Sequence, residues 1–367
     1  MSQIKEMESS GKKIIHFEIG DPNFDTPGTV IQAAKNSLDK GETHYTDSMG
    51  LMELRQEICA FTKKNLGFQP SVEQVLVIPA NAIIDYIVRC VVNPGEEVIY
   101  PDPGFPTYFS VINYAGMKPI AIPLKEENGF RMSPEDIRKN ITDKTRLIII
   151  NSSNNPTGSV MTKEEVKEVA AIAEEKDIYI LSDEVYSLIT YDKTYHSPSV
   201  YDHCKERTII LNSFSKGYSM SGWRLGYAIG PESVVAKMGL LLQTTISCLP
   251  AFIQRGGIAA LNVDQRLIIN RNKELKERRD ALVKGLNSIK GFSCHVPDGA
   301  FYAFPNIKNT GLSSENLADL LLYKANIAVL SGNCFGKYGE GYIRICYAST
   351  TKDIIEEAIR RMRDILN

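Results

Sequence analysis

Short apolar runs alternate with amphipathic stretches through the middle of the chain. Runs of about four to eight apolar residues are typical of buried strands, whereas apolar residues that recur about every three or four positions indicate helices. Strands are expected at 75–78, 96–100, 119–123, 146–150, 178–181 and 208–211. Helices are expected at 51–64, 81–92, 133–140, 162–176 and 231–246. This alternation predicts a three-layer, doubly wound α/β fold around a mostly parallel sheet.

The pattern changes after residue 262. A long helix is expected at 263–289, and its mixed charges are typical of a solvated face. Beyond it, strands are expected at 292–296, 301–304, 327–330 and 341–348, with a helix at 313–326. The 367 residues exceed the commonest domain size of about 100 to 150 residues. We therefore expect a large domain at 41–262 and a smaller α+β domain that combines 263–367 with the N-terminal segment 1–40.

Composition and charge disfavour several classes of protein. Lys and Arg number 42 against 44 Asp and Glu, without a basic block, which argues against a nucleic-acid partner. The seven cysteines form no Cys-x-x-Cys pair, so we expect reduced thiols in a cytoplasmic protein and no metal site. The first ten residues are polar, and no run approaches the roughly 18 apolar residues of a membrane span, so neither a signal peptide nor a membrane segment is expected.

The stretch that follows the strand at 208–211 carries the strongest candidate chemistry. A further strand is expected at 223–230, which places Lys216 and Arg224 where two strand ends meet. A lysine that attacks a carbonyl must lose its proton part of the time, and burial or the neighbouring arginine could lower its pKa. Arg224 with the hydroxyls of Ser213 and Ser215 makes a candidate phosphate clamp. Together they indicate pyridoxal phosphate, although a solvated loop lysine and a structural arginine remain the alternative.

This stretch resembles the lysine signature of class I and II aminotransferases, the fold type I pyridoxal-phosphate enzymes: Ser-x-Ser-Lys, seven residues, then Arg. Further motifs in family order extend the resemblance from Gly20 to Arg344. The resemblance implies that Lys216 holds the cofactor as an aldimine, a Schiff base. It also implies that the lysine moves a proton between the substrate's α-carbon and the cofactor's 4'-carbon.

Two polar strand ends supply candidate contacts to the cofactor ring. Asp183 ends the strand at 178–181, where a buried carboxylate costs several kcal/mol unless it meets a cation. A protonated pyridine nitrogen would be that cation, whereas the alternative is a paired surface acid. The string Ser-Asp-Glu-x-Tyr resembles the family motif, which implies that Tyr186 bonds the cofactor's 3-oxygen. The string Asn-x-x-x-Asn-Pro-Thr-Gly implies the same for Asn155, which would also bind the substrate carboxylate, and Phe105 would stack on the ring.

A strand feeds a helix N-terminus at Ala80-Asn81-Ala82, which is a ready anion site. We expect Asn81 to cap the helix. The family places its phosphate turn here, commonly as Gly-Ala-x or Gly-Gly-x, so a positive φ at Ala80 would be strained. The lysine that some relatives carry at the place of Ala82 is missing, which weakens the case for an acidic substrate side chain.

Three further residues are implied by resemblance alone. The backbone of Gly20 would line the substrate pocket. Tyr45 would cross the interface of a homodimer to the neighbouring subunit's phosphate. Arg344 interrupts an apolar strand and needs an anion, either a structural acid or, as in the family, the substrate's α-carboxylate.

The resemblance therefore implies an aminotransferase that moves an amino group from an amino acid or related amine to a 2-oxo acid, often 2-oxoglutarate in this family. One alternative is a pyridoxal-phosphate decarboxylase or carbon–sulfur lyase of the same fold. Arg224 and Arg344 favour transamination, because a gripped carboxylate is held away from the orientation in which it would be lost. The other alternative is a cofactor-binding sensor domain, which we disfavour because such domains follow a helix-turn-helix segment and the sequence has no room for one before Gly20.

Overall fold

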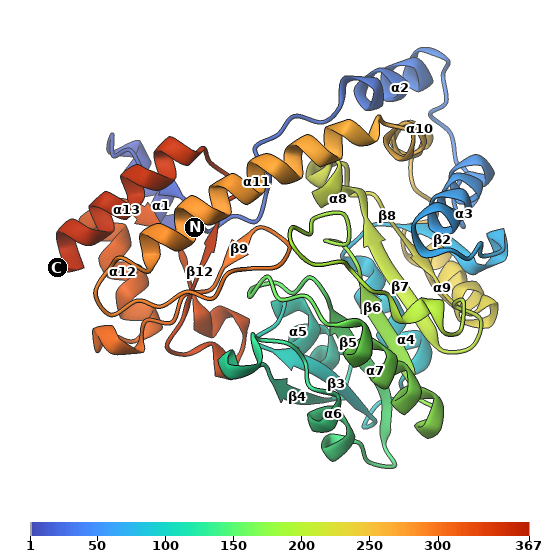
Figure 1. Cartoon of the computed structure of the whole chain (residues 1–367). Coiled ribbons are helices and arrows are strands. Elements are labelled where there is room, and N and C mark those ends of the chain that lie inside the picture. The colour runs from blue at the N-terminus through green and yellow to red at the C-terminus, as the bar shows by residue number, and fades with distance from the viewer. Residues whose placement is uncertain (1, 367) are drawn as a thin grey trace.

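The computed structural model describes residues 2–366. Its centre is a seven-stranded sheet with the order β2-β8-β7-β6-β5-β3-β4. These strands are β2 (Val75–Ile78), β3 (Glu97–Asp102), β4 (Lys118–Pro123), β5 (Thr145–Asn151), β6 (Tyr179–Asp183), β7 (Thr208–Ser213) and β8 (Gly226–Ile229). Neighbouring strands run parallel except for β8, which is antiparallel to β2 and β7. The predicted mostly parallel sheet is confirmed (Figure 1).

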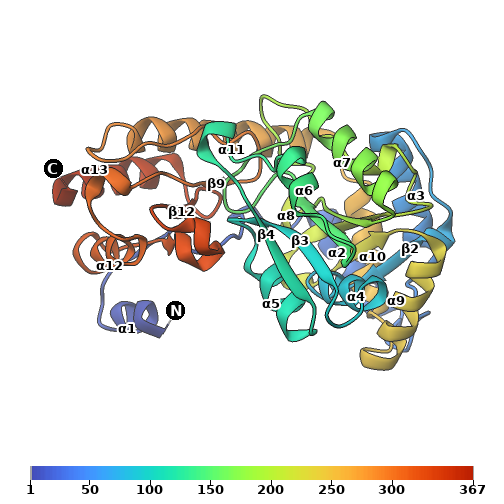
Figure 2. The ribbon, with the colours of Figure 1, turned by 90° about the horizontal axis from the view of Figure 1, so that it is seen from below.

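Helices cover both faces of this sheet. One face packs against α4 (Ala82–Val91), α5 (Pro106–Tyr114) and α9 (Glu232–Thr245), and the other against α6 (Pro134–Asn140) and α7 (Lys163–Lys176). Figure 2 shows the sheet between these two layers. Successive residues of β5 enter opposite cores, Leu147 and Ile149 on one face and Ile148 and Ile150 on the other. A strand covered on both faces tends to be apolar at successive positions, which explains the continuous apolar run at 147–150.

A second group of elements carries both ends of the described chain (Figure 1). Strands β9 (Tyr302–Ala303), β11 (Leu330–Ser331) and β12 (Ile343–Cys346) form an antiparallel sheet in the order β11-β12-β9. The N-terminal strand β1 (Ile15–His16) pairs in parallel with β10 (Ile327–Ala328). Strands β1, β9, β10 and β12 share a core with α11 (Gln265–Leu286), α12 (Ser314–Ala325) and α13 (Lys352–Leu366), whereas Leu330 of β11 packs against the core that contains α6 and α7. Met7 of α1 (Ser2–Ser9) packs on Leu322 and Ala328.

Three more helices complete the large part of the molecule. They are α2 (Gly28–Asp39), α3 (Met52–Leu66) and α10 (Ala251–Leu261). Helix α2 contacts α10, beside which it lies in Figure 1, and its Val30 belongs to the core of the central sheet. The N-terminal segment therefore contacts both parts of the molecule, through β1 in one and α2 in the other.

The sequence pattern misses several elements of the described chain. The unpredicted helices are α1, α2, α5, the single turn α8 (Phe214–Gly217), α10 and α13. In α5, the Pro-rich and aromatic start resembles a loop, yet Pro106 occupies the first helical turn, where its missing N–H costs nothing. The strand expected at 292–296 contributes only the bridge between Ser293 and Asn306. No helix within residues 2–366 is long and apolar enough to cross a membrane.

Candidate active site

A cavity of about 250 Å³ lies at the carboxyl ends of the parallel strands, where ligands bind in open α/β sheets. Most of the side chains that the sequence singled out line this cavity. The predicted residues that line it are Gly20, Ala80, Asn81, Phe105, Asn155, Asp183, Tyr186, Ser213, Ser215, Lys216, Arg224 and Arg344. The remaining lining residues are Ile84, Asn151, Val185, Leu211 and Tyr302. Two predicted residues, Tyr45 and Ala82, do not line it.

Lys216 enters the cavity from α8 (Phe214–Gly217), a single turn that begins directly after β7. The Ser213 hydroxyl caps this turn by accepting a hydrogen bond from the Ser215 N–H at 3.0 Å. The Lys216 Nζ donates to the Gly20 carbonyl at 2.5 Å. Burial lowers the pKa of Lys216, and Arg344 and Arg224 lower it further, while Asp21 opposes them. The expected cation effect of Arg224 is therefore present but smaller than that of burial.

Arg224 reaches the cavity from a different local structure than predicted. The turn η4 (Ser221–Trp223) precedes it, and its own φ is 56°, so the strand begins only at Gly226. The expectation that residues 223–225 extend this strand is wrong because the backbone turns there. Ser213 still pairs with Gly226, which keeps Arg224 close to the start of α8. The Arg224 Nη1 donates to the Ser221 carbonyl at 2.7 Å, and the side chain is exposed.

The turn at Ala80-Asn81-Ala82 joins β2 to α4 without the features that the sequence suggested. Asn81 occupies the N-cap position, but its side chain makes no capping hydrogen bond, so the predicted cap is wrong. Its φ of −71° is helical, and this backbone turns the side chain away from the capping geometry. Ala80 does not adopt a positive φ, so the expected strain is absent. The Ala82 N–H closes the turn on the Pro79 carbonyl at 2.9 Å.

Asp183 ends β6 and is only 3% exposed. The Tyr108 hydroxyl donates to its Oδ2 at 2.5 Å, and the Val185 N–H donates to its Oδ1 at 3.3 Å. Burial raises the pKa of Asp183 to about 6. No cationic side chain within residues 2–366 pairs with it, which excludes the alternative of a paired surface acid. A buried carboxylate with only neutral donors is suited to a ligand that brings a positive charge.

Arg344 lies on β12 and is 5% exposed. Its Nη1 donates to the Asn155 Oδ1 at 3.2 Å and its Nη2 to the Glu18 carbonyl at 2.5 Å, whereas its buried Nε has no partner among the described residues. None of the ion pairs within residues 2–366 includes this arginine, so the structural acid considered from the sequence is not found there. The side chain lines the cavity, and Nη1 and Nη2 each keep a second N–H besides the one that these acceptors take, so the guanidinium can donate to an anionic ligand there.

Two tyrosines that the sequence did not single out complete the surroundings. Tyr108 of α5 contacts Asp183 and packs edge-on against Phe105, with ring centroids 5.8 Å apart. Tyr302 of β9 lines the cavity, and its hydroxyl lies 2.8 Å from that of Tyr186. Tyr108 follows Phe105 by three residues, but the sequence predicted a loop here, so no helical spacing pointed to their contact. No pattern in the sequence pairs Tyr302 with Tyr186, because they are 116 positions apart.

The remaining predicted residue lies apart from this cavity. The side chain of Tyr45 is 89% exposed and does not line the cavity of its own chain. Within residues 2–366, no group of three or more His, Cys, Asp or Glu side chains could hold a metal ion.

The cavity fits pyridoxal phosphate at each end. Asp183 could pair with a protonated ring nitrogen, and the Arg344 guanidinium, which pairs with no acid among the described residues, could donate to a substrate carboxylate. The hydroxyls of Ser213 and Ser215 and the guanidinium of Arg224 offer phosphate donors, and Ile84, Val185 and Leu211 offer apolar surface to a ring.

Comparisons with known proteins agree with this chemistry. The model of the family described as aminotransferase class I and II matches residues 12–362. The chain is 41% identical to the aspartate aminotransferase of Pyrococcus horikoshii, over 100% of the chain and 94% of that protein. It is also 41% identical to aromatic-amino-acid aminotransferase 2 of Thermococcus litoralis, over 96% of the chain and 92% of that protein. The solved aromatic aminotransferase of Pyrococcus horikoshii superimposes with a TM-score of 0.93 at 38% identity, covering 99% of this chain and 98% of that one. The chain therefore belongs to the class I and II aminotransferases and is a pyridoxal-phosphate-dependent enzyme that acts on amino and oxo acids.

Proposed function

We propose that this aminotransferase takes an α-amino acid as its donor and a 2-oxo acid as its acceptor, with Lys216 and Arg344 as the residues that decide the reaction. The observation that carries the proposal is the placement of an arginine without an acidic partner among the described residues in the same cavity as a desolvated lysine. Burial lowers the pKa of the lysine, so it gives up its proton more readily than an exposed lysine does. The arginine can hold the carboxylate of the molecule whose proton is moved.

Each end of the cavity then has a distinct task. When bound, pyridoxal phosphate supplies an electron-accepting ring that stabilises negative charge at the substrate's α-carbon. Asp183 would keep the ring nitrogen protonated, and Tyr108 orients Asp183 through its 2.5 Å hydrogen bond. Phe105, which lines the cavity, would hold the plane of the ring, while Asn155 and Tyr186 would donate to its 3-oxygen. Ser213, Ser215 and Arg224 would hold the phosphate, together with the turn at Ala80-Asn81-Ala82.

Lys216 is positioned for the proton transfer. Its Nζ is held by the Gly20 carbonyl at 2.5 Å, and Gly20 lines the same cavity, so the amine and the substrate share one side of the site. Because burial lowers its pKa, the amine spends part of the time uncharged and can accept the α-proton. With the cofactor bound, the same amine would deliver that proton to the cofactor's 4'-carbon.

The carboxylate grip supports transamination over loss of carbon dioxide. Asn155 and Glu18 hold the Arg344 guanidinium, and the rings of Tyr302 and Phe335 lie 4.5 and 4.9 Å from its Cζ. A guanidinium fixed in this way would bind the carboxylate in one orientation. A carboxylate that is held in place is not free to turn into the orientation in which it would be lost, and the C–H bond is broken instead.

The proposal is tested by titrating the purified holoenzyme with each amino acid in turn, without an oxo acid. We expect the visible spectrum to shift to that of pyridoxamine phosphate for the true donors, with release of the matching 2-oxo acid. Release of carbon dioxide or of a sulfur compound instead would show a decarboxylase or lyase, and a spectrum that no amino acid shifts would contradict the proposal.

We further propose a homodimer in which Tyr45 serves the neighbouring subunit. Tyr45 is 89% exposed, and several apolar side chains on α2, α3 and α9 and at the end of α9 are exposed as well. They are Ile31, Leu38, Met52, Leu240 and Ile246. Exposed apolar side chains gathered in one patch are typical of a protein interface.

Mixed dimers test whether Tyr45 acts in the partner's site. Tyr45→Ala and Lys216→Ala chains are purified separately, each with low activity, and then refolded together. If Tyr45 crosses the interface, a mixed dimer contains one intact site, so random pairing restores about one quarter of the wild-type sites. Each variant mixed with itself is the control. Absence of recovery in verified mixed dimers would show that Tyr45 does not act across the interface.

We also propose the two-domain division that the sequence predicts, with one change. The separate cores around the central sheet and around α11 to α13 support it. Because Val30 packs in the core of the central sheet, we move the first boundary from residue 40 to about residue 27. A cytoplasmic location is supported by the seven cysteines, all of which are free.

A further inference from the structure

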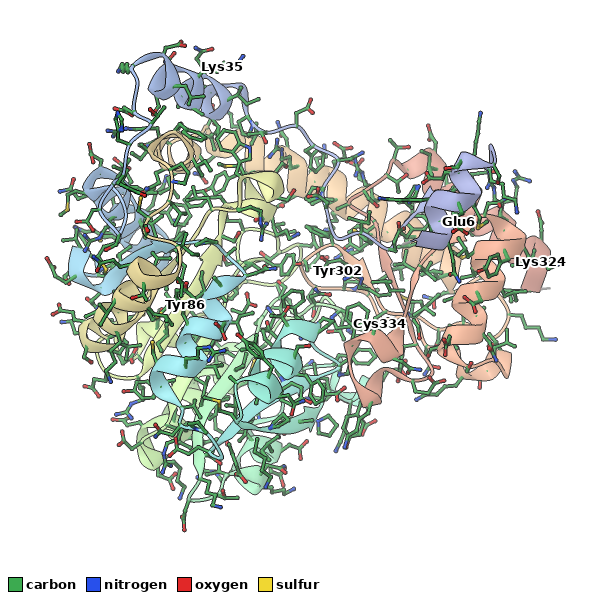
Figure 3. All side chains as sticks on the ribbon, turned by 180° about the vertical axis from the view of Figure 1, so that it is seen from behind. Glu6, Lys35, Tyr86, Tyr302, Lys324 and Cys334 are labelled. Atoms are coloured by element: carbon green, nitrogen blue, oxygen red, sulfur yellow. The ribbon has the colours of Figure 1, made fainter. Side chains whose placement is uncertain are left out.

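Tyr302 touches two groups that the proposed function assigns to different parts of the reaction. Its hydroxyl lies 2.8 Å from the hydroxyl of Tyr186, and the guanidinium carbon of Arg344 lies 4.5 Å from its ring centroid. The side chain is 1% exposed and lines the cavity, in the centre of the molecule (Figure 3). One buried side chain therefore contacts both Tyr186, the proposed donor to the cofactor's 3-oxygen, and Arg344, the proposed binder of the substrate carboxylate.

The two hydroxyls can share their hydrogen bond in only two ways. Burial raises the pKa of both tyrosines, so each oxygen keeps its proton at neutral pH. If Tyr186 donates to Tyr302, its proton is used and cannot point into the cavity. If Tyr302 donates to Tyr186, the Tyr186 proton is free for a ligand oxygen. The Tyr302 hydroxyl has no other hydrogen-bond partner among the described residues, so nothing there competes with the second arrangement.

The ring of Tyr302 acts on Arg344 separately from the hydroxyl. A guanidinium that lies over an aromatic face is attracted to that face, which limits how the guanidinium can turn. Asn155 and the Glu18 carbonyl accept one N–H each from Nη1 and Nη2, so each of these nitrogens keeps a second N–H. The Tyr302 ring thus helps to orient the remaining N–H groups.

Gly20 shows how closely the Tyr302 hydroxyl is packed. A Cβ on Gly20 would lie 2.2 Å from this hydroxyl oxygen and 3.1 Å from the ring carbon that bears it. The φ of Gly20 is not positive, so space and not backbone conformation requires glycine here. The carbonyl of the same glycine accepts the hydrogen bond of Lys216.

We propose that Tyr302 is a positioning residue with two functions: its hydroxyl donates to Tyr186, so that Tyr186 donates to the 3-oxygen of pyridoxal phosphate, and its ring orients Arg344 toward the substrate carboxylate. The inference rests on the proposed function, since it needs the cofactor and the carboxylate in this cavity. Chains of hydrogen bonds strengthen one another, so loss of the first donor weakens the second.

The Tyr302→Phe variant of the holoenzyme tests the hydroxyl. A weaker bond to the 3-oxygen leaves more negative charge on that oxygen and favours a proton on the neighbouring nitrogen. We therefore expect the pH midpoint of the visible chromophore to rise by about 0.5 unit. We expect kcat to fall about three- to tenfold, the range of one hydrogen bond. The KM for the amino acid should change less than twofold, because the ring remains.

The Tyr302→Leu variant tests the ring. Loss of the stacked face should raise the KM for the amino acid by about 2- to 30-fold, in addition to the midpoint change. Tyr347→Phe is the matched control, because Tyr347 is also fully buried and its hydroxyl donates to that of Tyr191 at 3.2 Å, outside the cavity. This control should leave the chromophore midpoint and the KM unchanged.

Gly20→Ala tests the packing without the cofactor. The substitution should lower the thermal midpoint of the apoprotein more in the wild-type background than in Tyr302→Phe, where the atom at 2.2 Å is missing. Equal losses in the two backgrounds would contradict the contact on which the proposal depends.

The outcomes separate the two proposals. A wild-type holoenzyme whose spectrum no amino acid shifts would overturn the proposed function. A wild-type enzyme that responds normally, with the same chromophore midpoint in Tyr302→Phe and Tyr347→Phe, would overturn the positioning role of the Tyr302 hydroxyl alone. A KM in Tyr302→Leu equal to that of the wild type would overturn the role of its ring.

Discussion

Replacing Lys216 by alanine is expected to lower the turnover of amino acids by about 10⁴-fold or more and to remove the visible chromophore. The amine is the only group of the cavity that combines a lowered pKa with a position beside Gly20, and no neighbour replaces it. The measurement is kcat with the preferred donor, together with the spectrum of the variant after incubation with pyridoxal phosphate.

The fold should survive this substitution, so the loss can be assigned to chemistry. Removing a desolvated amine relieves a burial cost, and the methyl group of alanine fits the same helical turn. Lys193→Ala is the control, because this lysine pairs with Asp298 on the surface and lies outside the cavity. Normal turnover in Lys216→Ala that is folded and free of wild-type enzyme would remove the lysine from the mechanism.

Replacing Asp183 by asparagine is expected to lower kcat by about 10²- to 10³-fold, the range seen when one preorganised electrostatic group is lost. An amide cannot carry the charge that keeps the ring nitrogen protonated, although it fills the same space and can still accept from Tyr108. Steady-state kinetics with saturating cofactor measure the effect. A variant that retains wild-type kcat would show that the ring nitrogen needs no anion here.

The same substitution should change how the stability of the apoprotein depends on pH. The pKa of Asp183 is about 6 in the folded protein, above its ordinary value of 3.8, because burial disfavours the charge. The folded state therefore binds the proton more tightly, and this stabilisation is full below pH 3.8 and is lost as the pH rises through about 6. A pKa difference of about two units corresponds to about 3 kcal/mol in the free energy of unfolding. The asparagine variant lacks this contribution.

Urea unfolding of the apoproteins at pH 4 and pH 7 measures this contribution as a difference between wild type and Asp183→Asn. Glu184 has a pKa of about 7, raised chiefly by burial and slightly by the charge of Asp183, so most of its loss is common to both proteins. Only the difference between them belongs to Asp183. A difference near zero would show that the carboxylate titrates as if it were exposed.

Local patterns predicted the elements whose formation depends on nearby residues. The strand at Val75–Ile78 has the expected bounds, because four apolar residues between polar turns suit a strand covered on both faces. Helix α7 begins as expected, since Thr162 and Glu165 form a capping box within one turn. The bend at Arg224 and the uncapped Asn81 were not predicted, because packing between β8 and the adjoining turn sets the backbone there.

By itself, the sequence determined the alternation of strands and helices, the polar residues at the strand ends, and thereby the residues that would share one edge of the sheet. Parallel strands bring their carboxyl ends together whatever the details of their packing, so Asn155, Asp183 and Lys216 could be assigned to one site. Only the tertiary structure decided what these side chains contact. Tyr108 forms a hydrogen bond with Asp183, 75 positions away in the chain, and Tyr302 forms one with Tyr186, 116 positions away. The ring of Tyr302 also lies against Arg344. Such contacts depend on how separate layers pack against one another, and no periodicity along the chain records them.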